Sequence, residues 1–179
     1  MERKLSVWQF SGFAFTALIG TLLHFLYDWT HRSIAAAVFS AVNESTWEHM
    51  KLLFFPMLVF ALIQHRFFKE YKVFWCIKAL GILTGLALIP VLFYTYNGVF
   101  GKSPDIVNIM IFFISAAGAF ALEMLLFKKG CLHCKKTHLP FAAICLIAVL
   151  FMIFTFYTPR IPLFRDPIDG TYGITTVGI

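Results

Sequence analysis

Most of the side chains in this sequence that could carry out chemistry lie in one short segment. Between positions 40 and 56 the chain reads SAVNESTWEHMKLLFFP, with apolar sequence on both sides. If a helix covers this segment, Glu44 and Glu48 are one turn apart and Lys51 follows, so the three side chains share a face. A carboxylate in such a group could act as a general base, and the ammonium of Lys51 could stabilise negative charge. All three residues are therefore candidates for catalysis.

The same segment also fits a structural interpretation. Ser45 and Glu48 have the spacing of a capping box, in which a serine begins a helix and a glutamate three positions later completes the cap. Acidic side chains suit a helix N-terminus because its amides are exposed there. Capping accounts for these two residues but does not require the nearby Glu44, His49 or Lys51. Capping alone, and capping combined with a functional site, therefore both stay open.

Residues elsewhere in the chain could complete the site. His24 and Asp28 are four positions apart, which is one helical turn. His24 could serve as a ligand or base, with Asp28 as an orienting, ligating or catalytic carboxylate. Alternatively, Asp28 pairs with Arg32 and His24 makes a hydrogen bond inside the protein. A catalytic zinc site needs three converging protein ligands, and the candidates are His24, Asp28, Glu44, Glu48, His49 and an aspartate of the tail. The preferred set of zinc ligands is His24, His49 and Asp166.

The C-terminal segment has the composition of a turn-rich loop. Residues 159–173 read PRIPLFRDPIDGTYG, and proline, glycine and aspartate at this density are typical of turns. We expect residues 159–179 to form an ordered tail outside the membrane. The tail could be a simple surface loop, or a lid that brings Asp166, Asp169 or Tyr172 to the site.

Four cysteines are present, and two of them form the only C-x-x-C motif. Cys131 and Cys134, with His138 nearby, would supply part of a zinc site. We favour two free thiols instead. Cys76 and Cys145 lie in apolar runs, where cysteine behaves as a small buried hydrophobe. The sequence contains no phosphate-binding glycine loop, no G-x-S-x-G motif and no dinucleotide fingerprint.

The composition indicates a membrane protein. Hydrophobic residues make up 60% of the chain, charged residues 13%, and the mean hydropathy is +0.80. A soluble domain carries roughly 25% charged residues, and one core of this size could not bury so much apolar surface. We expect a single integral membrane domain over residues 1–179. Because Lys and Arg lie at the ends of apolar segments, the expected partner is the lipid bilayer and not a nucleic acid.

Five apolar runs are long enough to cross the hydrocarbon core, which takes about 20 residues. They cover residues 7–27, 51–68, 73–96, 106–127 and 139–157. Backbone polar groups cannot stay unpaired in lipid, so each run is expected to be a helix and the fold an all-α polytopic bundle. The run at 7–27 is too long for a signal peptide and is expected to remain as a span. A shorter run at 33–42 is expected to form a re-entrant or interfacial helix.

The distribution of lysine and arginine predicts the orientation. With the N-terminus inside, the inner segments hold nine of these residues and the outer segments five, and Lys78 lies within a span, which accounts for all 15. Positive charge is enriched on the cytoplasmic side, so we expect an N-inside, C-outside protein of the cell membrane. Several polar residues would then converge on one outward face, which we expect to hold the site: His24, Asp28, the segment 43–51, Tyr94, Tyr96, Asn97, Asp105, Asn108, Asp166, Asp169 and Tyr172. The outward-facing polar pocket itself is expected to be lined by His24, Asp28, Glu44, Glu48 and His49.

Two further features concern helix packing. Lys78 and Glu123 lie at similar depths in two different spans, and pairing them removes the cost of isolated charges in the membrane. We expect this pair to be structural. The motif Gly81-x-x-x-Gly85 should let two helices approach closely.

The segment from Asn43 to Pro56 resembles the signature N-E-S-x-W-E-H-x-K-L-x-F-F-P of an uncharacterised family of small bacterial membrane proteins. The resemblance also includes residues elsewhere: His24, Asp28, Phe164, Asp166, Pro167, Tyr172 and Gly173. It covers most of the chain and implies no function. The same segment is also similar to the N-E-x-x-N-x-W-S-H segment of the membrane hydrolases that include alkaline ceramidases and progestin/adiponectin receptors. This chain lacks their late H-x-x-x-H pair and has five expected spans where they have seven.

Three functions are consistent with these residues. The first is an intramembrane hydrolase that acts on a lipid or amphiphile through a metal-bound or base-activated water. The second is a protein that binds or transports a small solute, in which the same residues bind substrate or relay protons. The third is an accessory membrane subunit that docks a partner through its polar face.

Overall fold

The computed structural model describes residues 2–130, 132–134, 136 and 138–174, and this part of the chain contains helices and no strand. The helices are α1 (Glu2–Trp29), α2 (Ile34–Ala37), α3 (Thr46–His65), α4 (Phe74–Phe100), α5 (Asp105–Lys129), α6 (His138–Phe156) and the 3-10 turn η1 (Pro162–Phe164). Five of them, α1 and α3 to α6, are long and apolar enough to cross a membrane. The expected all-α polytopic bundle is confirmed, and the chain is a multi-pass membrane protein.

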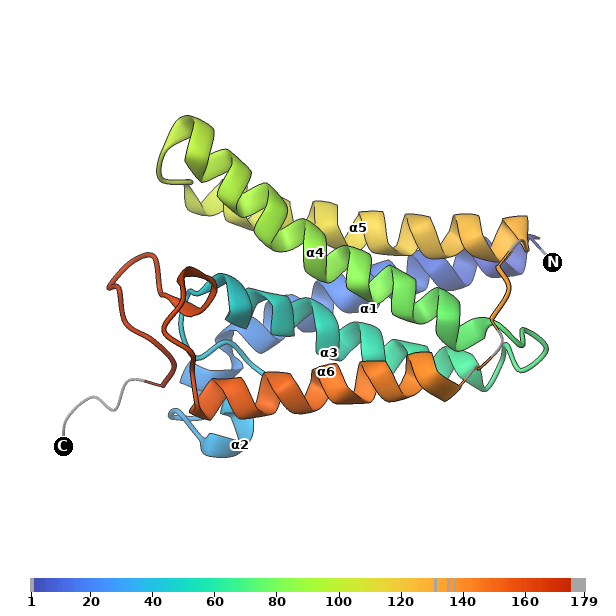
Figure 1. Ribbon diagram of the computed structural model, residues 1–179, viewed down its shortest axis with the longest axis horizontal. Helices are drawn as coiled ribbons and strands as arrows, with labels where there is room; N and C mark the ends of the chain where they lie inside the picture. Colours follow the sequence, from blue (N-terminus) through green and yellow to red (C-terminus); the bar gives the residue numbers. More distant parts are fainter. Residues whose placement is uncertain (1, 131, 135, 137, 175–179) are drawn as a thin grey trace.

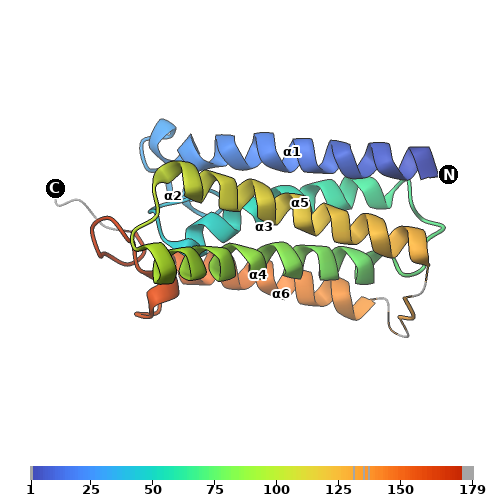
Figure 2. The ribbon, with the colours of Figure 1, turned by 90° about the horizontal axis from the view of Figure 1, so that it is seen from above.

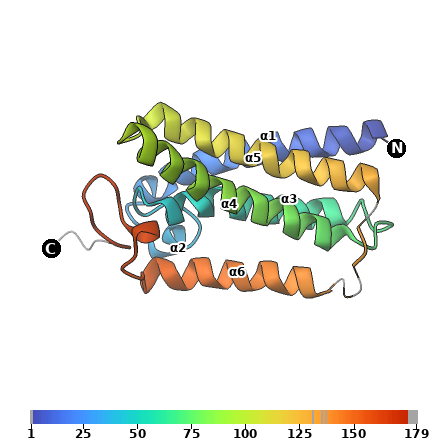
Figure 3. The ribbon, with the colours of Figure 1, turned by 45° about the horizontal axis from the view of Figure 1, so that its top comes forward.

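The five long helices run alongside one another, and the start of α1 and the tail after α6 lie at opposite ends of the bundle (Figure 1). An odd number of spans requires this separation of the termini. Helix α3 occupies the middle of the bundle and contacts α1, α4, α5 and α6 (Figures 2 and 3). Two connecting segments, 30–45 and 101–104, lie at one end of the bundle together with the tail, 157–174. We call this end the site end.

Helix α3 begins five residues earlier than the apolar run at 51–68 indicates. Ser45 is its N-cap, and the Ser45 hydroxyl accepts a hydrogen bond from the Glu48 amide at 3.4 Å. This half of the predicted capping box is confirmed. The Glu48 carboxylate accepts from the Val42 amide at 3.1 Å instead of from Ser45, because Asn43 already accepts the bond from the Ser45 amide.

Close helix packing occurs at the predicted glycines. A Cβ atom at Gly81 would overlap the Glu123 side chain of α5, and one at Gly85 would press on Leu53 and Ala119. The Lys78 ammonium pairs with Glu123 at 2.5 Å and donates to the Gln64 side chain at 3.1 Å. The expected Lys78–Glu123 pair is therefore confirmed, and both side chains are fully buried.

The expectation of two free thiols in the C-x-x-C motif is wrong for Cys134, which forms a disulfide with Cys76 at the start of α4. The Cα atoms are 6.6 Å apart, within the usual range for a disulfide. Cys131 lies outside the described residues. Cys145 is free, and it is exposed on α6 instead of buried as expected.

The short run at 33–42 contains one helical turn, α2, and does not span the bundle. Ala36 and Ala37 are buried against Tyr27 near the end of α1. Ser33 precedes this turn without a side-chain cap. The segment thus closes the site end beside α1, in agreement with its length, which is too short to cross a membrane.

Candidate functional site

Two histidines and one glutamate meet at the site end of the bundle. His24 lies near the end of α1, Glu44 lies in the loop before α3, and His49 lies in the first turn of α3. The His24 Nε2 atom is 3.6 Å from one Glu44 carboxylate oxygen, and the His49 Nε2 atom is 3.4 Å from the other. Each residue offers a ligand atom, and these three atoms all lie within 4.8 Å of one another. We call His24, Glu44 and His49 the donor cluster.

The tautomer of His49 is determined by its backbone neighbour. His49 Nδ1 lies 3.0 Å from the carbonyl oxygen of Ser45, which can only accept. Nδ1 must therefore carry the proton and donate it, which leaves the lone pair on Nε2 facing Glu44. Ligating histidines in metal proteins commonly use this arrangement to fix the ring and the tautomer.

The C-terminal tail holds Glu44 in place. The Asp166 carboxylate accepts a hydrogen bond from the Glu44 amide at 2.9 Å with one oxygen, and from the Ile168 amide at 2.7 Å with the other. The Asn43 side chain donates to the carbonyl of Gly173 at 3.1 Å. These contacts join positions more than a hundred residues apart and make the tail part of the site.

The tail is a small hairpin in residues 159–174, and the rest of the expected ordered tail, 175–179, lies outside the described residues. Arg165 and Tyr172 form an isolated bridge. Hydrogen bonds from Thr171 lower the pKa of the Asp169 carboxyl below its ordinary value, so this turn carries an ionised carboxylate. Asp169 and Tyr172 are not among the residues that line the cavities described below.

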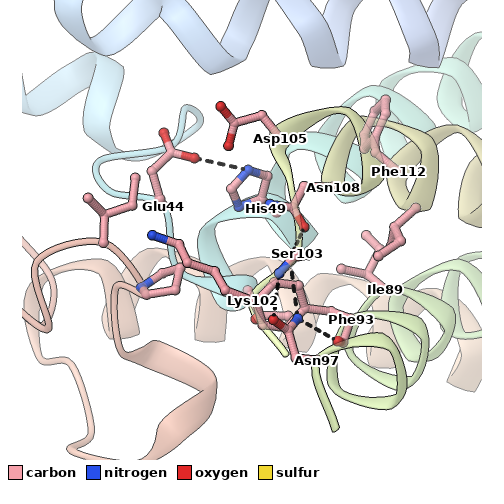
Figure 4. Close-up of a pocket in the computed structure, with 14 residues that line it drawn as sticks. Glu44, His49, Ile89, Phe93, Asn97, Lys102, Ser103, Asp105, Asn108 and Phe112 are labelled. Carbon is pink, nitrogen blue, oxygen red and sulfur yellow. Dashed lines mark hydrogen bonds and ion pairs between the residues drawn. The ribbon is translucent and has the colours of Figure 1, made fainter. Parts of the chain in front are cut away.

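Two cavities open beside the donor cluster. The larger, of about 440 Å³, is lined mainly from α1, α3 and α5, and the smaller, of about 280 Å³, from α3, α4, α5 and the tail. Both are lined by Glu44 and His49, and His24 lines the larger one. Figure 4 shows His49 beside Glu44, with Asp105 and Asn108 facing it from the start of α5. The donor cluster thus lies where the two cavities meet.

The structure does not bring Glu48 and Lys51 to these cavities. The Lys51 ammonium lies 2.6 Å from the Glu48 carboxylate and donates to the Ala37 carbonyl at 2.9 Å and the Thr155 hydroxyl at 2.8 Å. Both charged side chains are buried. The predicted shared face fails because Glu44 precedes the helix, so it points away from its neighbour Glu48. The Glu48–Lys51 pair instead connects α3 to α2 and α6.

Two predicted carboxylates also lie outside the donor cluster. Asp28 is largely exposed, at 77% of its side-chain surface, and its nearest cation is Arg32 at 3.9 Å. Asp166 is buried, but both of its oxygens are engaged by backbone amides. Of the preferred ligands His24, His49 and Asp166, the two histidines are therefore together, and Glu44, which was also a candidate ligand, takes the place of the aspartate.

Of the polar lining residues, Lys102 and Ser103 were not identified as site residues from the sequence, whereas Asn97, Asp105 and Asn108 were expected on the outer face that holds the site. The loop from α4 to α5 and the start of α5 supply polar side chains to the cavities: Asn97, Lys102, Ser103, Asp105 and Asn108. In the sequence these residues lie beside a glycine, a proline and the start of a helix, as in an ordinary connection between two helices. The packing of α5 against α1 and α4 places all five beside the donor cluster.

The donor cluster has the composition of a catalytic zinc site. Two histidines and one glutamate are the protein ligands of a well-known class of zinc hydrolases, which leave the fourth position open to water or substrate. Ligand atoms about 2.0 Å from a tetrahedral ion lie about 3.3 Å from one another. The two histidine nitrogens lie 3.6 and 3.4 Å from different oxygens of Glu44, and one ligand atom from each of the three residues lies within 4.8 Å of the others, so small side-chain movements would bring them to this spacing.

The chain matches a family described as "Family of unknown function (DUF6512)" over residues 1–174, and it belongs to that family. The expected membership of an uncharacterised family is thereby confirmed. No curated protein and no solved structure matches the chain. The likeness to the alkaline ceramidase group stays a prediction.

Proposed function

We propose that this member of the DUF6512 family is a zinc-dependent hydrolase that cleaves an amphiphilic substrate at the membrane surface. The observation that carries the proposal is the donor cluster of His24, Glu44 and His49, whose ligand atoms converge at the junction of two cavities. A bound ion there would have protein ligands on one side and a cavity on the other. An open position of this kind separates catalytic zinc sites from structural ones.

The residues around the cluster can supply the remaining chemistry. Zinc would provide a water molecule of lowered pKa and would polarise the group under attack. Asp105 lines both cavities and is our candidate for the general base. In ester cleavage its carboxylate takes a proton from the attacking water as the oxygen–carbon bond forms. The carbon–oxygen bond to the leaving group then breaks, and Asp105 returns the proton to that oxygen.

The oxyanion formed in this step needs hydrogen-bond donors. The oxygen of the Asn108 side chain accepts from the Ser103 hydroxyl at 2.7 Å, so its amide nitrogen is left to donate into the cavity. Lys102 lines the same cavity and adds positive charge. These two groups, one on the connection before α5 and one in its first turn, take the stabilising role that the sequence assigned to Lys51.

Metal analysis of the purified protein tests the first requirement. We expect about one zinc per chain, and we expect His24→Ala, His49→Ala and Glu44→Ala each to lose it. His138→Ala and Asp28→Ala are matched controls, because they remove the same ligand types outside the donor cluster and should keep the metal. Wild-type protein that takes up no zinc, or controls that lose it equally, would rule out the proposal.

Hydrolysis itself is tested with long-chain chromogenic esters in detergent micelles. Asp105→Asn should lower kcat by about 10²- to 10⁴-fold, the usual contribution of a general base. Its zinc content should not change, because Asp105 is outside the donor cluster. Full activity in Asp105→Asn would exclude Asp105 as the general base, but it would not contradict the proposed zinc site.

Small-solute or proton transport is a second candidate, favoured by one observation. Buried polar atoms with no hydrogen-bond partner among the described residues lie on three helices and include those of Gln9 and Thr16 on α1, Gln64 on α3, and Ser115 and Glu123 on α5. Such side chains inside a membrane bundle are typical of proton or solute paths. Proteoliposomes loaded with a pH-sensitive dye distinguish the two functions, because only transport predicts a proton flux that Glu123→Gln abolishes.

A further inference from the structure

We propose that the two cavities form one bipartite groove for a single-chain amphiphile with an anionic, phosphate-type headgroup. In this arrangement the chain enters from the bilayer between α1 and α5, and the headgroup lies beside Lys102. The inference rests on the proposed function for what happens to the amphiphile, but binding in the groove requires no cleavage.

The larger cavity provides an apolar arm. Besides the donor cluster, it is lined mostly by apolar or small residues: Gly20, Thr21, Phe25, Leu52, Ile109 and Phe113. Its volume of about 440 Å³ is within the range of ligand cavities. An alkyl chain is the ligand chemistry that such a lining accommodates.

The rim of the apolar arm lies on the part of the bundle that faces lipid. Phe25 on α1 is 47% exposed and Ile109 on α5 is 51% exposed, and both line the cavity. The two helices pack against each other, so this rim lies along their shared boundary. Exposed apolar side chains on membrane-spanning helices contact acyl chains. The cavity is therefore open to the hydrocarbon near the membrane surface, where an amphiphile could enter sideways.

The smaller cavity provides a polar arm. Asn97 and Ser103 satisfy each other, because the Ser103 amide donates to the Asn97 side-chain oxygen at 2.9 Å. Asn97 uses its own nitrogen on the Phe93 carbonyl at 2.8 Å. The donors left for a ligand include the Asn108 amide nitrogen and the Lys102 ammonium. Lys102 makes no ion pair with any described residue, and it faces this cavity in Figure 4.

These donors favour an anionic headgroup. Both can only donate, and a phosphate-type group offers several acceptor oxygens and a negative charge. A quaternary ammonium offers neither. Glu44 and Asp105 also line the polar arm and would repel an anion, but zinc bound to Glu44 would offset that charge. The headgroup is therefore expected to bind more tightly when zinc is present, whereas the position of the chain depends only on the apolar arm.

The two arms meet at the donor cluster, which determines where a bound amphiphile would be cut. Glu44, His49, Asp105 and Asn108 line both cavities. A molecule with its chain in one arm and its headgroup in the other must pass these residues with the atoms between chain and headgroup. The bond exposed to attack would thus be the one that joins the two parts.

Photochemical cross-linking of the full chain in nanodiscs tests the apolar arm. The probe is dodecyl phosphate with a diazirine at the chain terminus, and we expect cross-links at positions 20–25 and 109–113. Thr21→Trp, which places a large ring at the exposed rim, should reduce this labelling several-fold. Leu22→Trp is the matched control, because Leu22 is exposed on the same helix but does not line the cavity.

Competition with unlabelled amphiphiles tests the polar arm. We expect dodecyl phosphate to compete about tenfold better than dodecyltrimethylammonium, since a charge-assisted hydrogen bond is worth about one factor of ten in affinity. Lys102→Gln should remove most of this preference, and Lys128→Gln, at the opposite end of α5, should retain it. Equal competition by the two amphiphiles in the wild-type protein would overturn the headgroup assignment.

The outcomes separate the groove from the hydrolase. Localised cross-links in a wild-type protein that binds no zinc would support the groove and end the hydrolase proposal. Zinc binding and ester cleavage with cross-links spread over all lipid-facing helices, α6 included, would support the hydrolase and overturn the groove. The groove proposal would also be overturned if Thr21→Trp left the labelling unchanged.

Discussion

The imidazole of His49 reaches the donor cluster because its other ring nitrogen is already bound to the chain. Its Nδ1 donates to Ser45, the N-cap residue of the same helix. Ser45 therefore has two functions, because its hydroxyl caps α3 and its carbonyl orients a candidate ligand. Capping and site formation, which are competing interpretations of this segment in the sequence, are combined in these two residues.

Glu44 depends in a comparable way on Asp166. Replacing the carboxylate by an amide in Asp166→Asn leaves one acceptor oxygen for three backbone donors, so the loop that carries Glu44 should loosen. We expect zinc affinity to fall about 10- to 100-fold, as is usual when the residue supporting a ligand is lost. Zinc competition with a chelator measures this. Asp169→Asn in the same hairpin is the control, and unchanged affinity in Asp166→Asn would show that the tail does not position Glu44.

Substitutions in the Glu48–Lys51 pair should lower the stability of the fold and leave zinc binding unchanged. Glu48→Gln and Lys51→Met should each destabilise the fold by roughly 3–5 kcal/mol, because each leaves a buried charge without its partner. The double variant should recover part of that loss. Folded fractions of all three should keep their zinc, since neither residue touches the donor cluster. Thermal unfolding in detergent, followed by metal analysis, checks both points. Loss of zinc without loss of stability would return these residues to the site.

Helix α4 shows how glycine sets the distance between two elements. Gly81 lies against the Glu123 side chain, whereas Gly98 has nothing near the position of an added Cβ atom. Both are helical residues, so they form a matched pair in one element. The approach of α4 to α5 at Gly81 is what allows Lys78 and Glu123 to pair inside the bundle.

Alanine substitutions at these glycines should therefore have opposite effects. Gly81→Ala should destabilise the protein by about 1–3 kcal/mol, because the methyl group displaces Glu123 from its buried partner. Gly98→Ala should be neutral or stabilise by up to about 1 kcal/mol, since alanine is the better helix former. Unfolding midpoints in the same detergent compare the two. A neutral Gly81→Ala would mean that α4 and α5 can separate at no cost.

The molecule as a whole has one feature that bears on its orientation. The charge distribution predicts that the N-terminus and the Cys76–Cys134 disulfide lie on the cytoplasmic side. Disulfides are rarely maintained there. We therefore expect this bond to be open in the cell and to close when the protein is purified in air.

Maleimide labelling of acid-quenched cells tests this orientation. In a Cys131→Ser/Cys145→Ser background, both remaining thiols should be labelled in cells and neither after aerobic purification. The reverse result in cells, two protected thiols, would place this end in an oxidising compartment and would invert the predicted topology. A reporter fused to each terminus gives an independent reading of the same orientation.

The helices could be predicted from the sequence because their causes are local. An apolar run of about 20 residues forms a helix in lipid whatever its neighbours are, since each backbone amide must find its partner within the segment. All five spans correspond to such runs, and the Ser45 cap follows from a four-residue pattern. The Lys78–Glu123 pair was also predictable, because two opposite charges at similar depth in a membrane have few alternatives to each other.

The donor cluster could be predicted only in part. Its two histidines follow from their positions near the same end of the first two spans, but the choice among the acidic residues depends on contacts across the whole chain. Asp166 is drawn to the Glu44 amide over a separation of 122 positions. Because helix α3 begins after Glu44, the helical face that Glu44 was expected to share with Glu48 does not exist. Glu48 is buried and Glu44 faces a cavity because of the way the loop, the tail and the helices pack together. No local sequence pattern encodes that packing.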